Sequence, residues 1–415
     1  MEPVFNFVEM FERSIGLKDP WKVVRAEFKE QQREVHVYVE ARKTVKYACP
    51  VCGKLSVRYD EEEDEREWRH ADVVMYPCYV HCRRPRVECP EHGIHVVEAP
   101  WARKGARQTL LFEGYAMMLA ETMTLNEARR VLRISRTALM HIVGYWVEKA
   151  VSEEDLGEVE QLSLDETSFK RGFSYVTVVG DPPRRRVIGV EDGRGMDAVE
   201  RFSLDFIARG GDCAKVQQIT MDMSQTYRKA CELCFPEARP VFDRFHVKQL
   251  VLVGMEEVRK QEQGRKFARS RIAGRKLLMI PEGRMTQQQM AATEALCGEY
   301  PKTGRAFRMV QELDDIYHCE TRTAADAALK ALTSWMMHSR LAPMKKAART
   351  LRQNRTEILE YFRNRLTNAF AEGMNSLIQA AKRKARGFRT FEGYRTMIFL
   401  AVGRLHLAYP QPFGV

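Results

Sequence analysis

The spacing of apolar and polar positions changes several times along the chain. Residues 33–47 alternate apolar and polar side chains, which is the period of a half-buried strand. Helical spacing begins at 107–149, and residues 246–389 predict helix almost throughout. Between these stretches lie three consecutive β-rich runs at 161–169, 173–181 and 184–192, then strands near 216–222 and 239–245 that alternate with helices at 197–209 and 224–235. This order predicts a mixed sheet with helices packed against it.

Length and composition indicate several domains and no membrane partner. The chain has 415 residues, of which 45% are hydrophobic, and this is too long for one compact domain. No apolar run approaches the ~18 to 20 residues that a membrane helix needs. The first ten residues lack the basic segment of a signal peptide, so the ten cysteines favour metal binding or buried thiols over disulfides. We therefore expect a cytoplasmic protein.

The net charge of +11 is unevenly distributed. Residues 340–406 hold 15 Lys and Arg against 4 Asp and Glu, whereas the rest of the chain holds 52 of each kind. A surface that lies against a polyanion concentrates positive charge in this way, because Lys and Arg neutralise phosphates and release counterions. A solvated helical face is the alternative explanation. The acidic run at 60–67 predicts a solvated loop.

Two zinc knuckles near the N-terminus predict a structural zinc site. Each knuckle is a pair of potential ligands three positions apart, followed by a glycine. Cys49 and Cys52 are followed by a glycine, and Cys89 and His92 repeat the same spacing with the same trailing glycine. Two ligands three positions apart on a tight turn can both face one tetrahedral ion. The sequence therefore predicts one Zn²⁺ held by these four residues.

The other paired cysteines have a different interpretation. Cys78 and Cys82 lie in a strand-like stretch, where they are interpreted as packing residues although they are spare zinc candidates. Cys231 and Cys234 lie one turn apart on an expected helix and have no second knuckle. We interpret this pair as core packing too.

Residues 125–145 have the pattern of a helix-turn-helix. The apolar face of its first helix comprises Ala128, Val131 and Leu132, Ile134 occupies the turn, and Ser135 caps a second helix that packs through Leu139 and Ile142. Arg133 stands where a glycine is often found in the turn. The outward face of the second helix offers groups suited to base edges in the major groove, namely Arg136, Thr137, Met140 and His141. A helix pair that only packs is the alternative.

Three carboxylates have the placement that metal-dependent phosphoryl transfer on DNA requires. That chemistry uses two divalent ions about 4 Å apart, held by a few carboxylates on a rigid frame. Asp165 lies inside an expected strand, Asp222 closes another, and Glu372 lies on an expected helix. The apolar stripe of that helix is Leu366, Phe370, Leu377, Ile378 and Ala381, and its polar face is Asn368, Glu372, Asn375, Ser376, Gln379, Lys382 and Arg383. This polar face suits one metal ligand flanked by phosphate contacts.

The order of knuckles, helix-turn-helix and carboxylates resembles the insertion-sequence transposases of the ISL3 group, which are DDE enzymes with an RNase H-like core. The resemblance covers nearly the whole chain, and its distinctive stretches are EWRHADVVMYPCYVHCRRPRVECPEHGI, SLDETSFKRG, MDMSQTY, PEARPVFDRFHV and AEGMNSLIQAAKRKARGFRTFEGYR. It implies that Asp165, Asp222 and Glu372 are the first, second and third acids of the catalytic triad. It also implies two catalytic Mg²⁺ ions, binding of terminal inverted repeats, a homo-oligomer assembled on DNA, and a place at the bacterial nucleoid.

The resemblance and the pattern together give an α/β multidomain architecture. We expect a zinc-binding ribbon at 1–104, a helix-turn-helix at 105–150, the first part of an RNase H-like core at 151–260, a helical insertion at 261–352, and the rest of the core at 353–415. The 150 positions between Asp222 and Glu372 are too many for a minimal core, which is why we expect the insertion.

Several further residues are candidates around the triad. Asp243 follows an expected strand and is the main rival to Asp222; it and His246 are interpreted as positioning residues near the metals. A structural histidine is an equally good interpretation of His246. The expected DNA contacts on the last basic helix are Asn375, Lys382, Arg383, Lys384 and Arg386. The main alternative to a transposase is a catalytically silent DNA-binding regulator, and a nuclease that cuts without joining is another.

Overall fold

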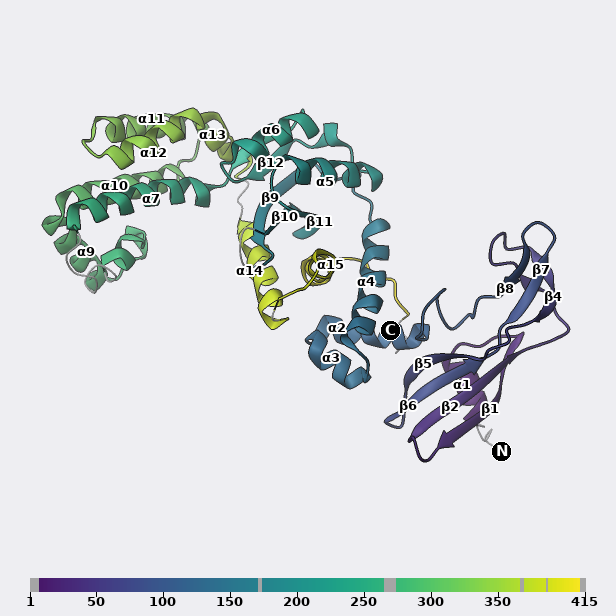
Figure 1. Ribbon diagram of the computed structural model, residues 1–415. Coiled ribbons are helices and arrows are strands. Elements are labelled where there is room, and N and C mark those ends of the chain that lie inside the picture. The colour runs from purple at the N-terminus through teal and green to yellow at the C-terminus, as the bar shows by residue number, and fades with distance from the viewer. Residues whose placement is uncertain (1–6, 171–173, 265–273, 366–368, 386, 411–415) are drawn as a thin grey trace. The chain divides into compact units, whose positions relative to one another are not determined.

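A computed structural model describes residues 7–170, 174–264, 274–365, 369–385 and 387–410 (Figure 1). The chain divides into two compact units. One comprises Met1–Ala150 together with His406–Val415, and the other comprises Val151–Leu405.

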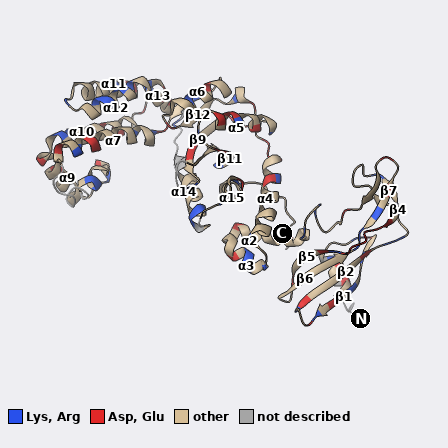
Figure 2. Ribbon diagram, in the orientation of Figure 1, with Lys and Arg blue, Asp and Glu red and all other residues tan. Residues whose placement is uncertain are grey.

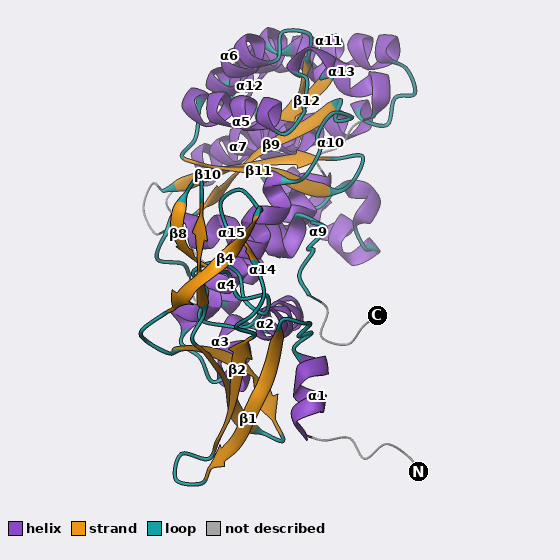
Figure 3. Ribbon diagram, turned by 90° about the vertical axis from the view of Figure 1, so that its right-hand side faces the viewer, coloured by secondary structure: helices purple, strands orange, loops and turns teal. Residues whose placement is uncertain are grey.

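The first unit begins with a four-stranded sheet of order β1-β2-β6-β5. Its strands are β1 (Trp21–Lys29), β2 (Glu34–Ala41), β5 (Arg66–Val73) and β6 (Tyr76–Cys82). Alternation on β2 sends Val35, Val37 and Val39 into the core, where α1 (Phe7–Ser14) also packs (Figure 3). The strand expected at 33–47 is therefore split, since β2 ends at Ala41 and a second short strand starts at Tyr47.

A smaller sheet of order β3-β4-β7-β8 carries the knuckles. Its strands are β3 (Tyr47–Ala48), β4 (Leu55–Glu61), β7 (Pro85–Cys89) and β8 (Gly93–Val96). The prediction of a loop at 60–67 was wrong at both ends, because β4 and β5 each extend into the acidic run. Cross-strand ion pairs explain this, since Asp60 pairs with Arg86 and Glu62 forms a two-pronged contact with Arg84 at 2.7 and 2.8 Å.

Three helices follow in the first unit, namely α2 (Leu110–Thr122), α3 (Leu125–Leu132) and α4 (Arg136–Ser152). Thr124 begins α3 with a capping box, in which its side chain and that of Glu127 each accept a backbone N–H from the other residue. These helices confirm the helical pattern at 107–149.

The second unit is built on a five-stranded sheet of order β11-β10-β9-β12-β13. Its strands are β9 (Gln161–Ser168), β10 (Tyr175–Asp181), β11 (Arg186–Asp192), β12 (Gln218–Met221) and β13 (Arg239–Phe242). The first three are antiparallel, whereas β12 runs parallel to both β9 and β13. This is the mixed RNase H-like sheet that the sequence predicts.

Helices cover both faces of this sheet (Figure 1). On one face lie α5 (Met196–Ala208) and α6 (Gln225–Cys234), and on the other lie α14 (Ala369–Lys384) and α15 (Phe391–Val402). Leu162 and Leu164 of β9 enter the core with Phe202 and Phe206 of α5. Cys231 is buried in the same core and Cys234 packs against it, which confirms their interpretation as packing residues.

A helical region separates β13 from α14. It contains α7 (Arg244–Gln263), α9 (Gln287–Glu299), α10 (Pro301–Ile316), α11 (Arg322–His338), α12 (Ala342–Gln353) and α13 (Arg355–Asn364). Their buried faces continue the core of the sheet without a break. Figure 2 shows Lys and Arg gathered toward the end of α14. Within the described ranges, no helix combines the length and apolar character needed to span a bilayer.

Candidate active site and zinc centre

Three acids lie at one edge of the five-stranded sheet. Thr220 of β12 pairs with Ser163 of β9, so Asp222 and Asp165 each lie two residues further along neighbouring parallel strands. Asp243 directly follows β13, and its backbone N–H donates to the Met221 carbonyl at 3.0 Å. Because the carboxyl ends of parallel strands meet at the same edge, strand pairing alone brings these acids together.

Asp165 is half-buried on the face of the sheet that α14 covers. The Asn375 side-chain amide donates to Asp165 Oδ2 at 2.6 Å, and the Glu166 backbone N–H donates to Oδ1 at 2.7 Å. Burial raises the pKa of Asp165 to about 6, and the Asp243 and Asp222 carboxylates add to the rise, while the Glu166 N–H and His246 oppose it. A buried acid with a raised pKa beside other acids is a typical place for a bound cation.

His246 lies between the other two acids. Its Nδ1 is 3.2 Å from Asp222 Oδ1, and its Nε2 is 3.9 Å from Asp243 Oδ2. Asp243 caps α7, since its Oδ1 accepts from the Phe245 N–H at 3.3 Å. The side chain of Asp222 is 49% exposed and that of Asp243 only 3%. Asp222 is therefore open to a ligand, whereas Asp243 is already used to begin a helix.

One face of α14 is attached to β9 by side-chain hydrogen bonds. Gln379 Nε2 donates to Thr167 Oγ1 at 2.6 Å, and Lys382 Nζ donates to Ser168 Oγ at 3.0 Å. These donors follow Asn375 by one and two turns, so the polar stripe predicted from the sequence faces the sheet.

A glycine lets this helix approach closely. A Cβ built on Gly180 of β10 would lie 2.5 Å from a ring carbon of Phe370 and 2.6 Å from Ser163 Oγ. The prediction that Leu377 belongs to the apolar stripe was wrong, because Leu377 is exposed while Ile378 is buried. Helix α14 therefore lies with its polar side, and not Leu377, against β9.

The remaining candidates on α14 are only partly described. Glu372 lies one helical turn before Asn375, but its side chain and that of Lys384 are outside the described atoms. Arg386 and Leu366 lie outside the described residues, as does Asn368. Arg383 is exposed.

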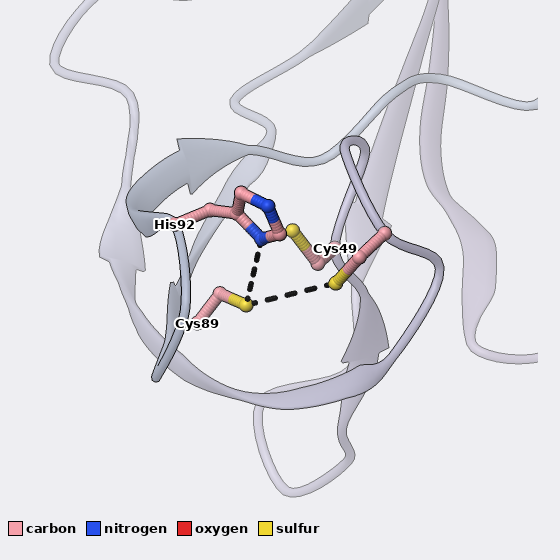
Figure 4. A group of neighbouring side chains, drawn as sticks. Cys49, Cys89 and His92 are labelled. Atoms are coloured by element: carbon pink, nitrogen blue, oxygen red, sulfur yellow. Dashed lines mark hydrogen bonds between the residues drawn. The ribbon is translucent and has the colours of Figure 1, made fainter.

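The four knuckle residues lie together at the end of the smaller sheet (Figure 4). One ligand atom from each of Cys49, Cys52, Cys89 and His92 lies within 4.8 Å of all the others. Cys52 Sγ is 3.8 Å from Cys89 Sγ, which is 3.5 Å from His92 Nδ1. This is a Cys₃His set of the kind that binds tetrahedral zinc.

Local backbone geometry forms each knuckle. Gly53 and Gly93 adopt φ values of +74° and +76°, which glycine reaches without steric cost. The His92 hydrogen bond, helped by the Glu91 backbone N–H, lowers the pKa of Cys89 to about 6. Because the thiolate is the form that binds metal, this thiol is prepared for a cation. Lys54 and Glu91 form an ion pair between the two knuckles.

Cys78 and Cys82 are buried in the core of the first sheet, and burial raises the pKa of each thiol to about 12. Neither belongs to the knuckle cluster. Their interpretation as packing residues is confirmed.

The helix-turn-helix pattern corresponds to α3 and α4. Ala128, Leu132, Leu139 and Ile142 are buried as predicted, and the Ser135 hydroxyl accepts the Ala138 N–H at 3.1 Å. Val131 was wrongly assigned to the apolar face, because it is exposed.

The turn and the outward face of α4 have further particular features. Arg133 adopts the left-handed conformation, with φ 54°, that glycine more often takes in such a turn. Arg136, Thr137 and His141 are exposed on α4, and Met140 is half-buried. This face of α4 is open to a partner.

The sequence does not predict one further group of potential metal ligands. His36, Glu67 and His81 offer ligand atoms within 4.8 Å of one another on the first sheet. Their positions carry no short spacing that would mark a site, since they come from three strands. Only the pairing of those strands brings them together.

Comparisons with known proteins match three successive parts of the chain. A transposase family model, that of the ISL3 group, matches residues 162–398. A model described as the zinc-finger of transposase IS204/IS1001/IS1096/IS1165 matches 46–92, and the helix-turn-helix domain of transposase family ISL3 matches 97–147.

Two curated relatives extend the similarity over nearly the whole chain. The transposase for insertion sequence element IS1557 of Mycobacterium tuberculosis is 23% identical over 437 residues, which cover 98% of this chain and 96% of the relative. The transposase for insertion sequence element IS1001 of Bordetella parapertussis is 23% identical over 387 residues, which cover 91% and 94%.

Proposed function

The chain belongs to the ISL3 family of insertion-sequence transposases, and we propose that it cuts and joins DNA ends by two-metal phosphoryl transfer at Asp165, Asp222 and Glu372. The observation that carries the proposal is the edge of the five-stranded sheet. Asp165 and Asp222 follow paired residues of parallel strands there, and α14, the helix of Glu372, is held beside Asp165 by Asn375.

The residues at this edge fit Mg²⁺. The candidate ligands are all carboxylate oxygens, which hard divalent cations prefer. Burial raises the pKa of Asp165 to about 6, and the Asp243 and Asp222 carboxylates add to the rise, so negative charge gathers where a cation would bind. When bound, two Mg²⁺ ions would activate the attacking oxygen and stabilise the leaving oxygen.

The surrounding side chains keep the acids in position. Asn375 fixes the orientation of Asp165 from the α14 side, and the Glu166 N–H holds its other oxygen. His246 holds Asp222 from the α7 side, while Asp243 anchors the start of α7. Asp222 is therefore assigned as the metal ligand, and Asp243 and His246 as positioning residues.

The DNA-reading part of the proposal rests on the first unit. The exposed face of α4 presents Arg136, Thr137 and His141, with Met140 beside them, to the major groove of a terminal inverted repeat. The Cys₃His cluster holds one structural Zn²⁺ that fixes the knuckles.

Affinity for phosphates comes from the basic surplus in residues 340–406. Arg383, with Lys384 and Arg386, is proposed as part of this contact. We expect the active species to be a homo-oligomer assembled on the ends of the element in nucleoid DNA.

The decisive experiment is cleavage and joining of labelled DNA that carries the ends flanking the gene. Wild type should nick at the ends and join them to a target with Mg²⁺. Glu372→Gln and Asp222→Ala should bind the ends and do neither. Asp197→Ala changes an exposed acid in the first turn of α5 and is the matched control, which should stay active.

Three outcomes contradict parts of this proposal. Cleavage by Asp222→Ala together with loss in Asp243→Ala would move the second metal ligand to Asp243. Wild type that binds ends but never cuts with Mg²⁺ or Mn²⁺ would make the chain a DNA-binding regulator. Cutting without joining would make it a nuclease.

A further inference from the structure

Two histidines are buried on the outer face of the first sheet. Val35, Val37 and Val39 of β2 face the core, so His36 and Tyr38 face the other way. In the parallel β2–β6 pair, Tyr38 lies opposite His81. Although this is not the core face, His36 is only 4% exposed and His81 only 7%.

The outer nitrogen of each ring is next to a carboxylate. His36 Nε2 is 3.2 Å from Glu34 Oε2, and His81 Nδ1 is 3.1 Å from Glu65 Oε2. An ionised carboxylate only accepts hydrogen bonds, so in each neutral ring the proton resides on the outer nitrogen. The inner nitrogens, His36 Nδ1 and His81 Nε2, then carry lone pairs.

These two inner nitrogens face each other at 2.7 Å. Two lone pairs at this separation repel unless a cation is shared between them. A third acid lies next to these nitrogens. Glu67 is opposite His81 in the β5–β6 pair, and its Oε2 is 3.7 Å from His81 Nε2. The arrangement therefore offers two imidazole nitrogens and one carboxylate to one cation.

We propose that His36, His81 and Glu67 form a second zinc-type site, separate from the Cys₃His knuckles. Neutral imidazole and carboxylate are ordinary zinc ligands, and a carboxylate on the far nitrogen of each histidine is the usual outer partner of a metal-binding histidine. Glu34 and Glu65 fill that role here.

The site has room and access for an ion. Zinc–nitrogen bonds of about 2.0 to 2.1 Å at a tetrahedral angle separate two nitrogens by roughly 3.3 Å, so the rings separate by about half an ångström when metal enters. A hollow of about 350 Å³ lined by Tyr38, Glu65 and His81 lies beside one of the three ligands, so an ion can approach the site from the His81 side. The ion would join β2, β5 and β6.

The test counts zinc bound to the full chain. Protein stripped with a chelator is reloaded with Zn²⁺, passed through a gel-filtration column and analysed for metal. An Asp165→Ala, Asp222→Ala background removes zinc binding at the catalytic edge. In that background we expect two zinc ions per chain. The double variant His36→Asn, His81→Asn should bind one ion, and Cys52→Ser should also bind one. His338→Asn removes a single exposed histidine of α11 as the matched control and should leave two.

Cobalt distinguishes the two sites and checks folding. The thiolate-to-cobalt absorption of the knuckles should persist in the histidine variants. If those variants do not fold, Glu34→Gln decides the question, since it keeps all three ligands and should weaken zinc binding at this site by roughly 10- to 100-fold. The proposal would be overturned if the background protein bound one ion and Cys52→Ser bound none. It would also be overturned if Glu34→Gln bound zinc with unchanged affinity. The short distance between the two rings would then be explained by a shared proton.

Discussion

Replacing Asn375 with alanine tests how the catalytic edge is assembled. The Asn375 amide donates to Asp165 at 2.6 Å. Among the described residues, the only other hydrogen-bond donor to that carboxylate is the Glu166 N–H at 2.7 Å. Asp165 must be ionised to hold a metal, yet burial has already raised its pKa to about 6. The amide therefore stabilises the form of Asp165 that the reaction needs.

The size of the effect follows from this contact. A hydrogen bond to a charged group contributes about 1.5 to 3 kcal/mol. Loss of that free energy changes an equilibrium constant by roughly 10- to 150-fold. In Asn375→Ala the pKa of Asp165 rises further, so at pH 7 a smaller fraction is ionised. We expect the Mg²⁺ concentration for half-maximal cleavage to rise about tenfold or more, and to recover in part at pH 8.5.

The assay is a Mg²⁺ titration of end cleavage at both pH values, with end binding measured separately in the absence of metal. Gln379→Ala is the matched control. It removes a donor on the same face of α14 that also bonds β9 at 2.6 Å, but to the hydroxyl of Thr167. Its Mg²⁺ requirement should stay near that of wild type.

One result would refute the reasoning. If Asn375→Ala weakens end binding without metal and leaves the Mg²⁺ requirement unchanged, then Asn375 is a DNA contact, as the sequence alone predicts. The orienting role would then be wrong.

Three further predictions concern other parts of the chain. His246→Asn removes the ring beside Asp222, so single-turnover cleavage should slow by roughly 10- to 100-fold with end binding intact, and an unchanged rate would show that the ring is only structural. Cys52→Ser should remove the knuckle zinc and weaken end binding, as measured by elemental analysis and a DNA-binding titration; full binding without that zinc would contradict the role of the knuckles. Burial lowers the pKa of His70 to about 4 from 6.5, so the unfolded chain takes up the proton first as the pH falls. The contribution of His70 to the free energy of unfolding is then fully present above pH 6.5 and declines by about 3 kcal/mol towards pH 4. Glutamine does not titrate, so urea unfolding of His70→Gln should show a decline smaller by this amount.

Local signals were sufficient to predict much of this fold. Three short β-rich runs in 161–192 predict three strands, and they are β9, β10 and β11. The knuckle spacing predicts a four-residue cluster, because both turns are formed by residues adjacent in sequence. Ser135 begins α4 for the same reason, since a cap depends only on the next three residues.

Features that depend on distant pairing could not be predicted. Asp60 and Glu62 lie in or beside β4 because Arg86 of β7 and Arg84 just before it neutralise them. His36 and His81 meet only through the parallel register of β2 and β6. Nothing within a short window of sequence encodes either contact.

The orientation of α14 shows what a helical pattern alone leaves open. Helical spacing identifies Asn375, Gln379 and Lys382 as one stripe, but it does not say what that stripe meets. The sequence predicts a metal ligand flanked by phosphate contacts there. In the structure part of this stripe meets β9, because the residues of β9 that face α14, including Asp165 and Thr167, are themselves polar. A half-buried carboxylate needs donors, and a polar helix face supplies them. Asn375 and Lys382 bond to β9, whereas Arg383 is exposed, so we propose that the DNA contact of this helix begins at Arg383.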